Sequence, residues 1–296
     1  MNSLVSLQSA ESAKYVPAEC REEWAKVGLC KARYLVAGAG DPILLLHGLL
    51  GYSFSWRKVI GPLSQRGQVF APDMPGSGFS ACATDLDCHL SSAAKRLAVF
   101  LDSVGISSCD LVASSYGGAT ALLLATQQPE RFRRMVLVSP ANSWSRTGAK
   151  RIRLLQTSAV RWLFPKAGQK LRCLHNYFLR RLYGDPARIT PEAYRGYSQP
   201  IALGGRLEHA VRIVQSWQED MEELRLALPR AAAIPVLLIW GGKDAAVDLA
   251  SAAMLRCNFR AAEIALIHDA GHLPYEEQPE EFLRIVNGFL NTTTGK

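Results

Sequence analysis

Residues 111–120 read LVASSYGGAT and set two adjacent serines in front of two glycines. The letters up to the first serine, CDLVAS, have the apolar character of a buried strand, and the later stretch GGATALLLATQQPE has the composition of a helix. Where a strand turns sharply into a helix, the residue at the turn is strained and its side chain is pushed clear of the sheet. One of the two serines is therefore predicted to stand at such a turn.

The size of the neighbouring side chains decides between Ser114 and Ser115. The residues two before and two after the turn are crowded together and must be small. The first serine has a valine and a tyrosine at these positions, which are too large, whereas Ser115 has Ala113 and Gly117. We predict that Ser115 is a nucleophile. The same short pattern also fits a serine that caps a helix, so the prediction depends on the residues that accompany it.

A serine hydroxyl becomes a nucleophile when a base removes its proton and an acid holds that base in one tautomer. Asp244 follows the apolar run IPVLLIWGG, and His272 follows the run AEIALIHDAG, so both stand in loops beyond predicted strands. The loops beyond the carboxyl ends of parallel strands share one edge of the sheet. We therefore predict that Asp244 and His272 meet Ser115. The competing residues nearby are assigned to turns or helix starts: His268, Asp269 and Asp248.

Two backbone N–H groups are predicted to stabilise an oxyanion beside the serine. Tyr116 follows the nucleophile at the start of the predicted helix, where N–H groups are free and the helix dipole is positive. The second donor is expected in LLLHGLLGYSFSW, with Leu49 preferred over Leu50. His47 stands at the end of the preceding strand and is expected to brace this loop.

Apolar runs alternate with helical patterns along most of the chain and predict an α/β fold with a mostly parallel sheet flanked by helices. From 141 to 229 only helical periodicity remains, as in QKLRCLHNYFLRRLY. We therefore expect a core domain of residues 1–140 and 230–296, with an all-helical cap, residues 141–229, inserted after the sixth strand. The stretch EEWAKVGLCKARYLVAG is a candidate for additional edge strands.

The composition limits the class of protein. The chain has 296 residues, 48 % of them hydrophobic, and no run approaches the roughly 20 apolar residues of a spanning helix. The first residues lack the pattern of a secretion signal, so a cytoplasmic location is expected. Seven scattered cysteines indicate reduced thiols rather than a disulfide framework, and no spacing typical of metal ligands occurs. We expect neither a metal nor a cofactor.

The motifs HGLLG, DMPGSGFS, ASSYGG, GGKDAAV and AGHLPYEEQPEEF together resemble the α/β-hydrolase superfamily over roughly residues 42–290. The similarity is to its capped serine hydrolases, which include esterases, carbon–carbon bond hydrolases and cofactor-free haloperoxidases. The resemblance implies a triad of Ser115, Asp244 and His272 and an oxyanion hole of Leu49 and Tyr116. Ala113 departs from the family pattern, which has glycine there, and Lys243 has no evident role.

The expected cap carries the excess positive charge of the chain. Residues 141–230 contain sixteen Lys and Arg against seven Asp and Glu, and aromatic residues are interleaved with them. Three interpretations remain open: a solvated helix face, a surface that lies on an anionic membrane, or arginines that attract an anionic substrate. Nucleic acid is the least expected partner, because no groove-reading or base-stacking motif accompanies the charge.

These observations favour a hydrolase that cleaves a carboxylic ester or a related acyl compound through an acyl-enzyme. Its partner would be a small acyl substrate, anionic or amphiphilic if the basic residues bind it. Hydrolysis of a carbon–carbon bond in a dienoic diketone is the alternative reaction, because the same triad can serve it. A ligand-binding protein that keeps the fold without catalysis is the alternative from another class.

Overall fold

The computed structural model describes residues 12–82, 85–157 and 172–291. Within these residues, eight strands form one sheet in the order β1-β2-β4-β3-β5-β6-β7-β8. The pairs β1–β2 and β2–β4 are antiparallel, and every other neighbouring pair is parallel. The strands are β1 (Arg21–Val27), β2 (Cys30–Ala37), β3 (Pro42–Leu46), β4 (Gln68–Pro72), β5 (Cys109–Ser114), β6 (Phe132–Val138), β7 (Val236–Gly241) and β8 (Ala262–Ile267).

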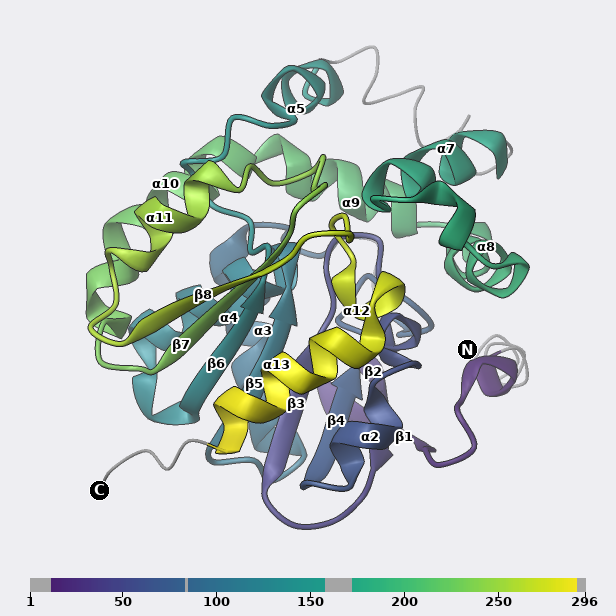
Figure 1. Cartoon of the computed structure of the whole chain (residues 1–296). Coiled ribbons are helices and arrows are strands. Elements are labelled where there is room, and N and C mark those ends of the chain that lie inside the picture. The colour runs from purple at the N-terminus through teal and green to yellow at the C-terminus, as the bar shows by residue number, and fades with distance from the viewer. Residues whose placement is uncertain (1–11, 83–84, 158–171, 292–296) are drawn as a thin grey trace.

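Helices cover both faces of this sheet (Figure 1). One face packs against α3 (Leu90–Ser103), α4 (Ser115–Gln127) and α11 (Ala250–Arg256), and the other packs against α2 (Ile60–Ser64) and α13 (Pro279–Asn291). The short helix α12 (Pro274–Glu277) precedes α13, and the 3-10 helices are η1 (Ala13–Tyr15), η2 (Ser53–Trp56), η3 (Pro129–Arg131), η4 (Pro186–Arg188), η5 (Pro200–Leu203) and η6 (Leu228–Ala231). The predicted α/β architecture is confirmed.

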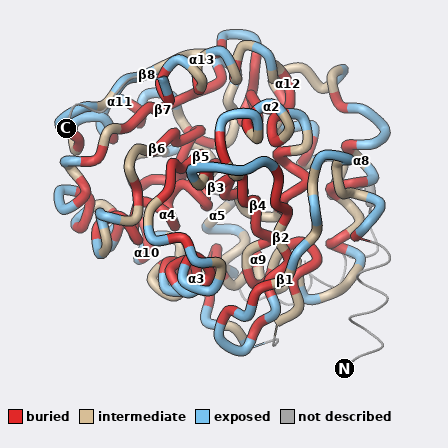
Figure 2. The backbone as a smooth tube through the Cα atoms, turned by 90° about the horizontal axis from the view of Figure 1, so that it is seen from below, coloured by how far each residue is buried: buried red, intermediate tan, exposed pale blue. Residues whose placement is uncertain are grey.

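The central strands are buried on both faces, which is why they read as continuous apolar runs. All six residues of β5 are buried, and the red tube of the inner strands in Figure 2 shows the same. Leu111 packs into the core on one face of the sheet, and Val112 packs into the core on the other. β5 therefore lies in the interior of the sheet, and its last residue, Ser114, directly precedes Ser115.

The stretch proposed as additional edge strands forms β1 and β2. They pair as a hairpin in which Val27 lies opposite Cys30, and Gly28 takes a left-handed φ of 61° in the turn. A side chain is strained in that conformation, so glycine suits this position.

The chain between β6 and β7 forms only helices in its described part, as the sequence predicts. They are α5 (Ala149–Leu155), α7 (Arg172–Leu182), α8 (Pro191–Ser198), α9 (Arg206–Gln215) and α10 (Trp217–Ala227). We call residues 141–229 the helical insertion. It lies beyond the carboxyl ends of the parallel strands in Figure 1, and α10 packs against α4. Residues 158–171, which hold part of the expected cap, lie outside the described residues.

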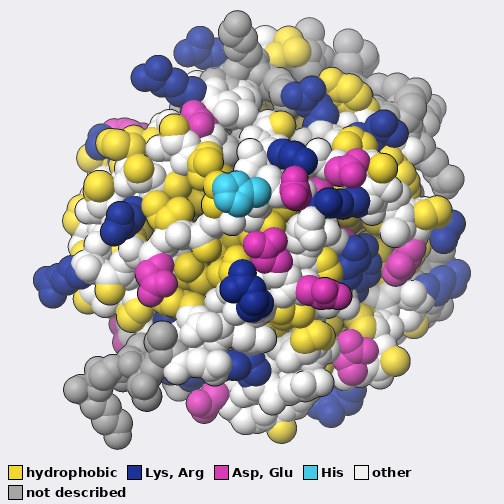
Figure 3. Space-filling model, in the orientation of Figure 1, with side chains coloured by type: hydrophobic (Ala, Val, Ile, Leu, Met, Phe, Trp, Pro, Cys, Tyr) yellow, Lys and Arg dark blue, Asp and Glu magenta, His cyan; other side chains and the backbone are white. Residues whose placement is uncertain are grey.

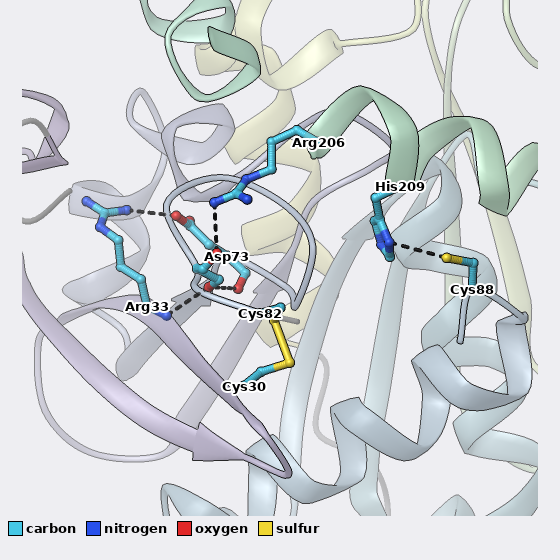
Figure 4. Close-up of a disulfide and its surroundings, with 8 residues drawn as sticks. Cys30, Arg33, Asp73, Cys82, Cys88, Arg206 and His209 are labelled. Atoms are coloured by element: carbon cyan, nitrogen blue, oxygen red, sulfur yellow. Dashed lines mark hydrogen bonds and ion pairs between the residues drawn. A yellow bond between two sulfur atoms is a disulfide. The ribbon is translucent and has the colours of Figure 1, made fainter. Parts of the chain in front are cut away.

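The expectation that all cysteines are reduced thiols is wrong for one pair, because Cys30 and Cys82 form a disulfide (Figure 4). Lys31 and Ala81 exchange two backbone hydrogen bonds of 2.9 and 3.0 Å, and this bridge brings the two cysteines together. The pairing joins residues 52 positions apart. Sequence spacing alone could not reveal a contact that depends on a loop returning to β2.

In the part of the chain that the structure describes, none of the helices is long and apolar enough to cross a bilayer.

Candidate active site

Ser115 occupies the turn between β5 and α4. Its φ is 51°, in the left-handed region, whereas Ser114 before it is extended with φ −112° and ψ 138°. A residue with a side chain pays for that conformation in strain, which is typical of a functional turn. Ser115 is partly exposed, and Ser114 is fully buried with its hydroxyl 3.2 Å from the hydroxyl of Tyr275, which donates to it. The structure therefore places Ser115, not Ser114, in the open position.

The neighbours of Ser115 are as crowded as the sequence predicts. Ala113 is completely buried, and a Cβ on Gly117 would lie 2.3 Å from the carbonyl oxygen of His47. A Cβ on Gly48 would lie 3.0 Å from the Cβ of Ser115. The loop after β3 therefore passes directly against the turn, and only small residues fit on either side.

His272 and Asp244 meet at the same edge of the sheet. Asp244 lies in the loop after β7 and His272 in the loop after β8, and Nδ1 of the histidine is 2.9 Å from Oδ2 of the aspartate. The other oxygen, Oδ1, accepts the backbone N–H groups of Ala246 at 2.7 Å and Val247 at 3.0 Å. These bonds fix the carboxylate, so the imidazole carries its hydrogen on Nδ1 and turns Nε2 away from Asp244.

The carboxylate of Asp244 is held in its charged form. Burial by itself raises the pKa of a carboxyl, but the charge and hydrogen bond of His272 outweigh it, and the nearby Ser139 hydroxyl and the Val247 N–H act in the same direction. The pKa of Asp244 therefore lies below its ordinary value. An anionic partner of this kind stabilises an imidazolium when the histidine takes up a proton.

The two predicted oxyanion donors belong to the two segments that meet at Ser115, the loop after β3 and the start of α4. Leu49 lies in the loop after β3, and Tyr116 follows Ser115 in the first turn of α4. Neither N–H donates a hydrogen bond to a protein group among the described residues. Leu50, the less preferred donor, has a left-handed φ of 60°. Both predicted N–H groups are thus available to a ligand oxygen.

His47 braces the loop after β3, as the sequence predicts. The backbone N–H of Met74 donates to its Nε2 at 3.0 Å, so the hydrogen is on Nδ1, which lies 2.8 Å from the carbonyl oxygen of Gly48. Burial also lowers the pKa of His47 and keeps the ring neutral. This histidine therefore links two loops and holds Gly48 in place beside Ser115.

Ser115 and His272 open on one cavity of about 590 Å³ between the sheet edge and the helical insertion. Its walls combine Leu49 and Val247 of the core with side chains of the insertion that are mostly apolar: Ile152, Leu155, Phe178, Leu179, Leu182, Ile201, Leu207, Val211, Val214, Trp217 and Met221. Uncharged polar side chains of the insertion complete the lining: Asn142, Ser143, Ser145, Thr147, Tyr197 and Gln218. Arg181 and Glu222 also line it, and both are exposed. The described lining of the cavity is therefore mostly apolar, and its two charged side chains from the insertion are exposed to solvent.

A loop of the core supports the insertion above this cavity. Arg206, the first residue of α9, donates to the carbonyl oxygens of Gly78 at 3.0 Å and Ser80 at 2.9 Å. The same loop is anchored by Asp73, whose carboxylate accepts a hydrogen bond from the buried Arg33 (Figure 4). Because α9 supplies cavity wall, this loop helps to fix the shape of the cavity.

Sequence reasoning missed the residues that hold the histidine loop. Glu277 is buried, and its carboxylate accepts backbone N–H groups from Gly271, Gly184 and Asp185. Glu277 follows another glutamate, and nothing in the sequence pattern marks one of the two as a residue that binds backbone N–H groups. Lys243, which had no evident role in the sequence, forms an exposed ion pair with Asp269 at 3.0 Å. Among the described residues no three His, Cys, Asp or Glu side chains gather to hold a metal ion.

The comparison with known families agrees with this arrangement. The sequence model of the alpha/beta hydrolase fold matches residues 41–279. The chain belongs to the alpha/beta hydrolase family. The resemblance noted in the sequence motifs is thereby confirmed, and hydrolase activity follows from the family and its relatives.

Individual alpha/beta hydrolases resemble this chain along most of its length. The 2-hydroxy-6-oxo-2,4-heptadienoate hydrolase of Pseudomonas putida is 27 % identical over 266 residues, which cover 86 % of this chain and 90 % of that protein. A bacterial membrane phospholipase A is structurally similar, with a TM-score of 0.80, 23 % identity and coverage of 98 % and 92 %. The 2-hydroxy-6-oxo-6-phenylhexa-2,4-dienoate hydrolase of Rhodococcus sp. strain RHA1 has a TM-score of 0.77, 22 % identity and coverage of 93 % and 99 %. These structures establish the shared fold.

Proposed function

We propose that this alpha/beta hydrolase is a serine hydrolase that cleaves carboxylic esters through an acyl-enzyme intermediate. The observation that carries the proposal is the His272–Asp244 pair, 2.9 Å apart, at the same cavity as a serine in a left-handed turn. A protein that only binds a ligand has no need of this combination. We also propose that residues 141–229 act as a cap over the site.

The proposed reaction uses each group once in each half. The hydroxyl oxygen of Ser115 attacks the ester carbonyl carbon while Nε2 of His272 takes the hydroxyl proton, and Asp244 stabilises the resulting imidazolium. The N–H groups of Leu49 and Tyr116 hold the negative oxygen of the tetrahedral intermediate. His272 then gives its proton to the departing alcohol. Water, deprotonated by His272, attacks the acyl carbon, and His272 returns that proton to the oxygen of Ser115 as the ester bond breaks and the carboxylic acid leaves.

The cavity walls favour a neutral, apolar acyl group. Apolar side chains from the insertion line most of the cavity that Ser115 also lines, and their burial against a hydrocarbon chain contributes roughly 25 cal/mol for each Å² removed from water. Arg181 is the one Lys or Arg among the described lining residues, and it is exposed to solvent. A substrate with its hydrocarbon inside and its polar part toward solvent satisfies these walls.

Carbon–carbon bond hydrolysis is the second candidate. Its support is the 27 % identity to a hydrolase whose name specifies a heptadienoate, an anionic compound. Such a substrate would need Arg181 to turn inward and pair with its carboxylate. Comparing a dienoic diketone with an apolar ester as substrates, in the wild type and in Arg181→Gln, separates the two reactions. Loss of diketone hydrolysis alone in the variant would favour this second candidate.

Contact with an anionic membrane remains a prediction for the basic stretch 146–181. Part of it lies outside the described residues, and the face shown in Figure 3 mixes Lys and Arg with Asp and Glu around apolar side chains. Sedimentation with vesicles of phosphatidylcholine alone, and with added phosphatidylglycerol, tests the idea. Binding that requires the anionic lipid and falls with salt would support it.

The decisive experiment compares the two adjacent serines. Ser115→Ala is expected to abolish both the turnover of short p-nitrophenyl esters and labelling by a fluorophosphonate probe, with the fold kept. Ser114→Ala is the matched control, because it removes a buried hydroxyl that bonds to Tyr275, and we expect it to cost about 1 kcal/mol of stability while labelling continues. A wild-type protein that resists the probe would favour the ligand-binding alternative.

A further inference from the structure

We infer that Glu277 is a positioning residue that fixes the loop of His272 by tying it to the end of α7 in the helical insertion. The inference rests on the proposed function, because it assigns Glu277 a part in holding the base. Glu277 does not reach the reacting atoms. It acts on the backbone on which His272 stands.

The carboxylate of Glu277 joins two segments that are far apart in sequence. One oxygen accepts the N–H of Gly271 at 2.7 Å, next to His272, and also lies 3.0 Å from the N–H nitrogen of Gly184. The other oxygen accepts the N–H groups of Gly184 at 2.9 Å and Asp185 at 3.1 Å. Glu277 is 7 % exposed, and no Lys or Arg side chain pairs with it among the described residues. Backbone N–H groups alone compensate this buried charge.

The two segments are in direct contact at glycines. A Cβ on Gly184 would lie 2.7 Å from the backbone nitrogen of Gly271, and a Cβ on Gly271 would lie 2.4 Å from that of Gly184. Neither position has room for a side chain, so the backbones meet and their N–H groups point together at one carboxylate. An acceptor at this place is required, because the N–H groups of Gly184 and Gly271 would otherwise lack one.

The backbone of His272 is itself bonded to the insertion. Its N–H donates to the carbonyl oxygen of Leu182 at 2.7 Å, at the last residue of α7. Its side chain is bonded to Asp244 at 2.9 Å. The imidazole is thus held from the core through its ring and from the insertion through its backbone. Glu277 reinforces the connection to the insertion, because its carboxylate accepts N–H groups from Gly271 beside His272 and from Gly184 just after α7.

A looser histidine loop should slow the chemical step rather than weaken substrate binding. Misplacing a base by about 1 Å costs up to a hundredfold in rate. The apolar walls that bind the acyl group are separate from the contacts of Glu277, which does not line the cavity. We therefore expect the loss of Glu277 to lower kcat and to leave KM nearly unchanged.

The test is Glu277→Gln in the full chain, with Glu280→Gln as the control because that carboxylate is exposed on α13. The glutamine would keep the shape but turn an NH₂ group toward backbone donors. We expect kcat for p-nitrophenyl acetate to fall about tenfold or more, with KM within about twofold. The low-field proton resonance of Nδ1–H in His272 should shift or broaden in Glu277→Gln and stay as in wild type in Glu280→Gln.

A second variant approaches the same contact from the insertion. Gly184→Ala should separate the two backbones and reproduce the loss of kcat and the change in the His272 resonance. Gly288→Ala controls for the added methyl, because nothing lies within 4 Å of that position. If folded Glu277→Gln and Gly184→Ala both keep wild-type kcat and resonance, the inference is overturned. An active Ser115→Ala would instead overturn the proposed function, whatever the two variants do.

Discussion

Nδ1 of His272 lies 2.9 Å from Oδ2 of Asp244, and both side chains are almost fully buried. The aspartate reaches this position from the loop after β7, where two backbone N–H groups hold its other oxygen. These backbone bonds orient the carboxylate, and its remaining oxygen binds the histidine. This relationship decides the tautomer of the proposed base.

Replacing Asp244 by asparagine should remove that control. The amide can donate to Nδ1 and so favour the tautomer with its hydrogen on Nε2, which cannot accept the proton of Ser115. We expect kcat for short esters to fall on the order of 10³-fold or more, with KM little changed. Steady-state kinetics with p-nitrophenyl acetate measures this. Asp269→Asn, which breaks only an exposed ion pair with Lys243, should keep full activity.

The packing at the turn predicts that Gly117→Ala is damaging. Its added methyl would lie 2.3 Å from the carbonyl oxygen of His47 and 2.8 Å from that of Leu46, so β3 and α4 must move apart. We expect the free energy of unfolding to fall by about 2 kcal/mol or more and the activity to be lost as well. Urea denaturation checks it against Gly288→Ala, which adds a methyl in open space and should gain up to about 1 kcal/mol. Equal stability of the two variants would contradict the packing argument.

His209 predicts a fall in stability as the pH becomes acidic. Burial, and then the charges of Arg96 and Arg212, lower the pKa of His209 from 6.5 to about 4. The unfolded chain therefore takes up a proton near pH 6.5, whereas the folded protein resists it until about pH 4. The free energy of unfolding should be unaffected by this residue above pH 6.5 and should drop between pH 6.5 and 4, by at most about 3 kcal/mol.

Urea denaturation from pH 4 to 8 tests this. The free energy of unfolding of His209→Gln should change less with pH than that of the wild type.

His89 should affect the free energy of unfolding in the opposite direction. Its hydrogen bond to Asp220 raises its pKa, so its contribution is complete at low pH and is lost as the pH rises above the raised value. A His89→Gln variant should therefore change the slope only at the upper end. Identical slopes in wild type and His209→Gln would contradict the assignment.

The disulfide should carry a measurable part of the stability. Cys30–Cys82 closes a loop with a sequence separation of 52, for which chain entropy predicts a contribution of about 4 kcal/mol. Cys30→Ala combined with Cys82→Ala, or reduction with dithiothreitol, should lower the midpoint of urea denaturation. Cys257→Ala, at an exposed free thiol, is the control and should leave it unchanged. A wild-type midpoint that does not respond to dithiothreitol would argue against the bond.

The cavity predicts a variant that selects among acyl chains. Val211 of α9 lines the cavity, and a tryptophan there would fill part of its space. We expect Val211→Trp to lower kcat/KM for p-nitrophenyl decanoate at least about tenfold while that for the acetate changes little. Val99→Trp, on the exposed side of α3, should alter neither. A uniform loss across all chain lengths in Val211→Trp would mean that the acyl group lies elsewhere.

Much of this arrangement could be predicted because it depends on local patterns. Apolar runs that end in turns indicated the strands of the parallel sheet, and their carboxyl ends share one edge, so the loops of Ser115, Asp244 and His272 had to be neighbours. The requirement for small neighbours selected Ser115 without any knowledge of the fold. Helical periodicity likewise indicated the character of the insertion.

What the sequence could not reveal depends on contacts between distant segments. The hydrogen bonds of Glu277 need the end of α7 beside the histidine loop, and no periodicity encodes that meeting. The pairing of Cys30 with Cys82 depends on a loop returning to β2. The cavity wall depends on which face α9 turns toward the cavity and on the hydrogen bonds that hold Arg206 at its start. These features come from packing rather than from the pattern of the individual segments.

Among the residues that the structure describes, three that are not glycine hold left-handed backbone angles, Leu50, Ser115 and Ser139, and each follows a strand that leads to the site. Such conformations cost on the order of 1–3 kcal/mol each. Selection for heat resistance would consequently favour glycine at positions 50 and 139, where the angle is comfortable without a side chain. The same exchanges would remove the Leu50 side chain from the cavity wall and the Ser139 hydroxyl from beside Asp244, so a gain in thermostability at these positions is expected to lower turnover.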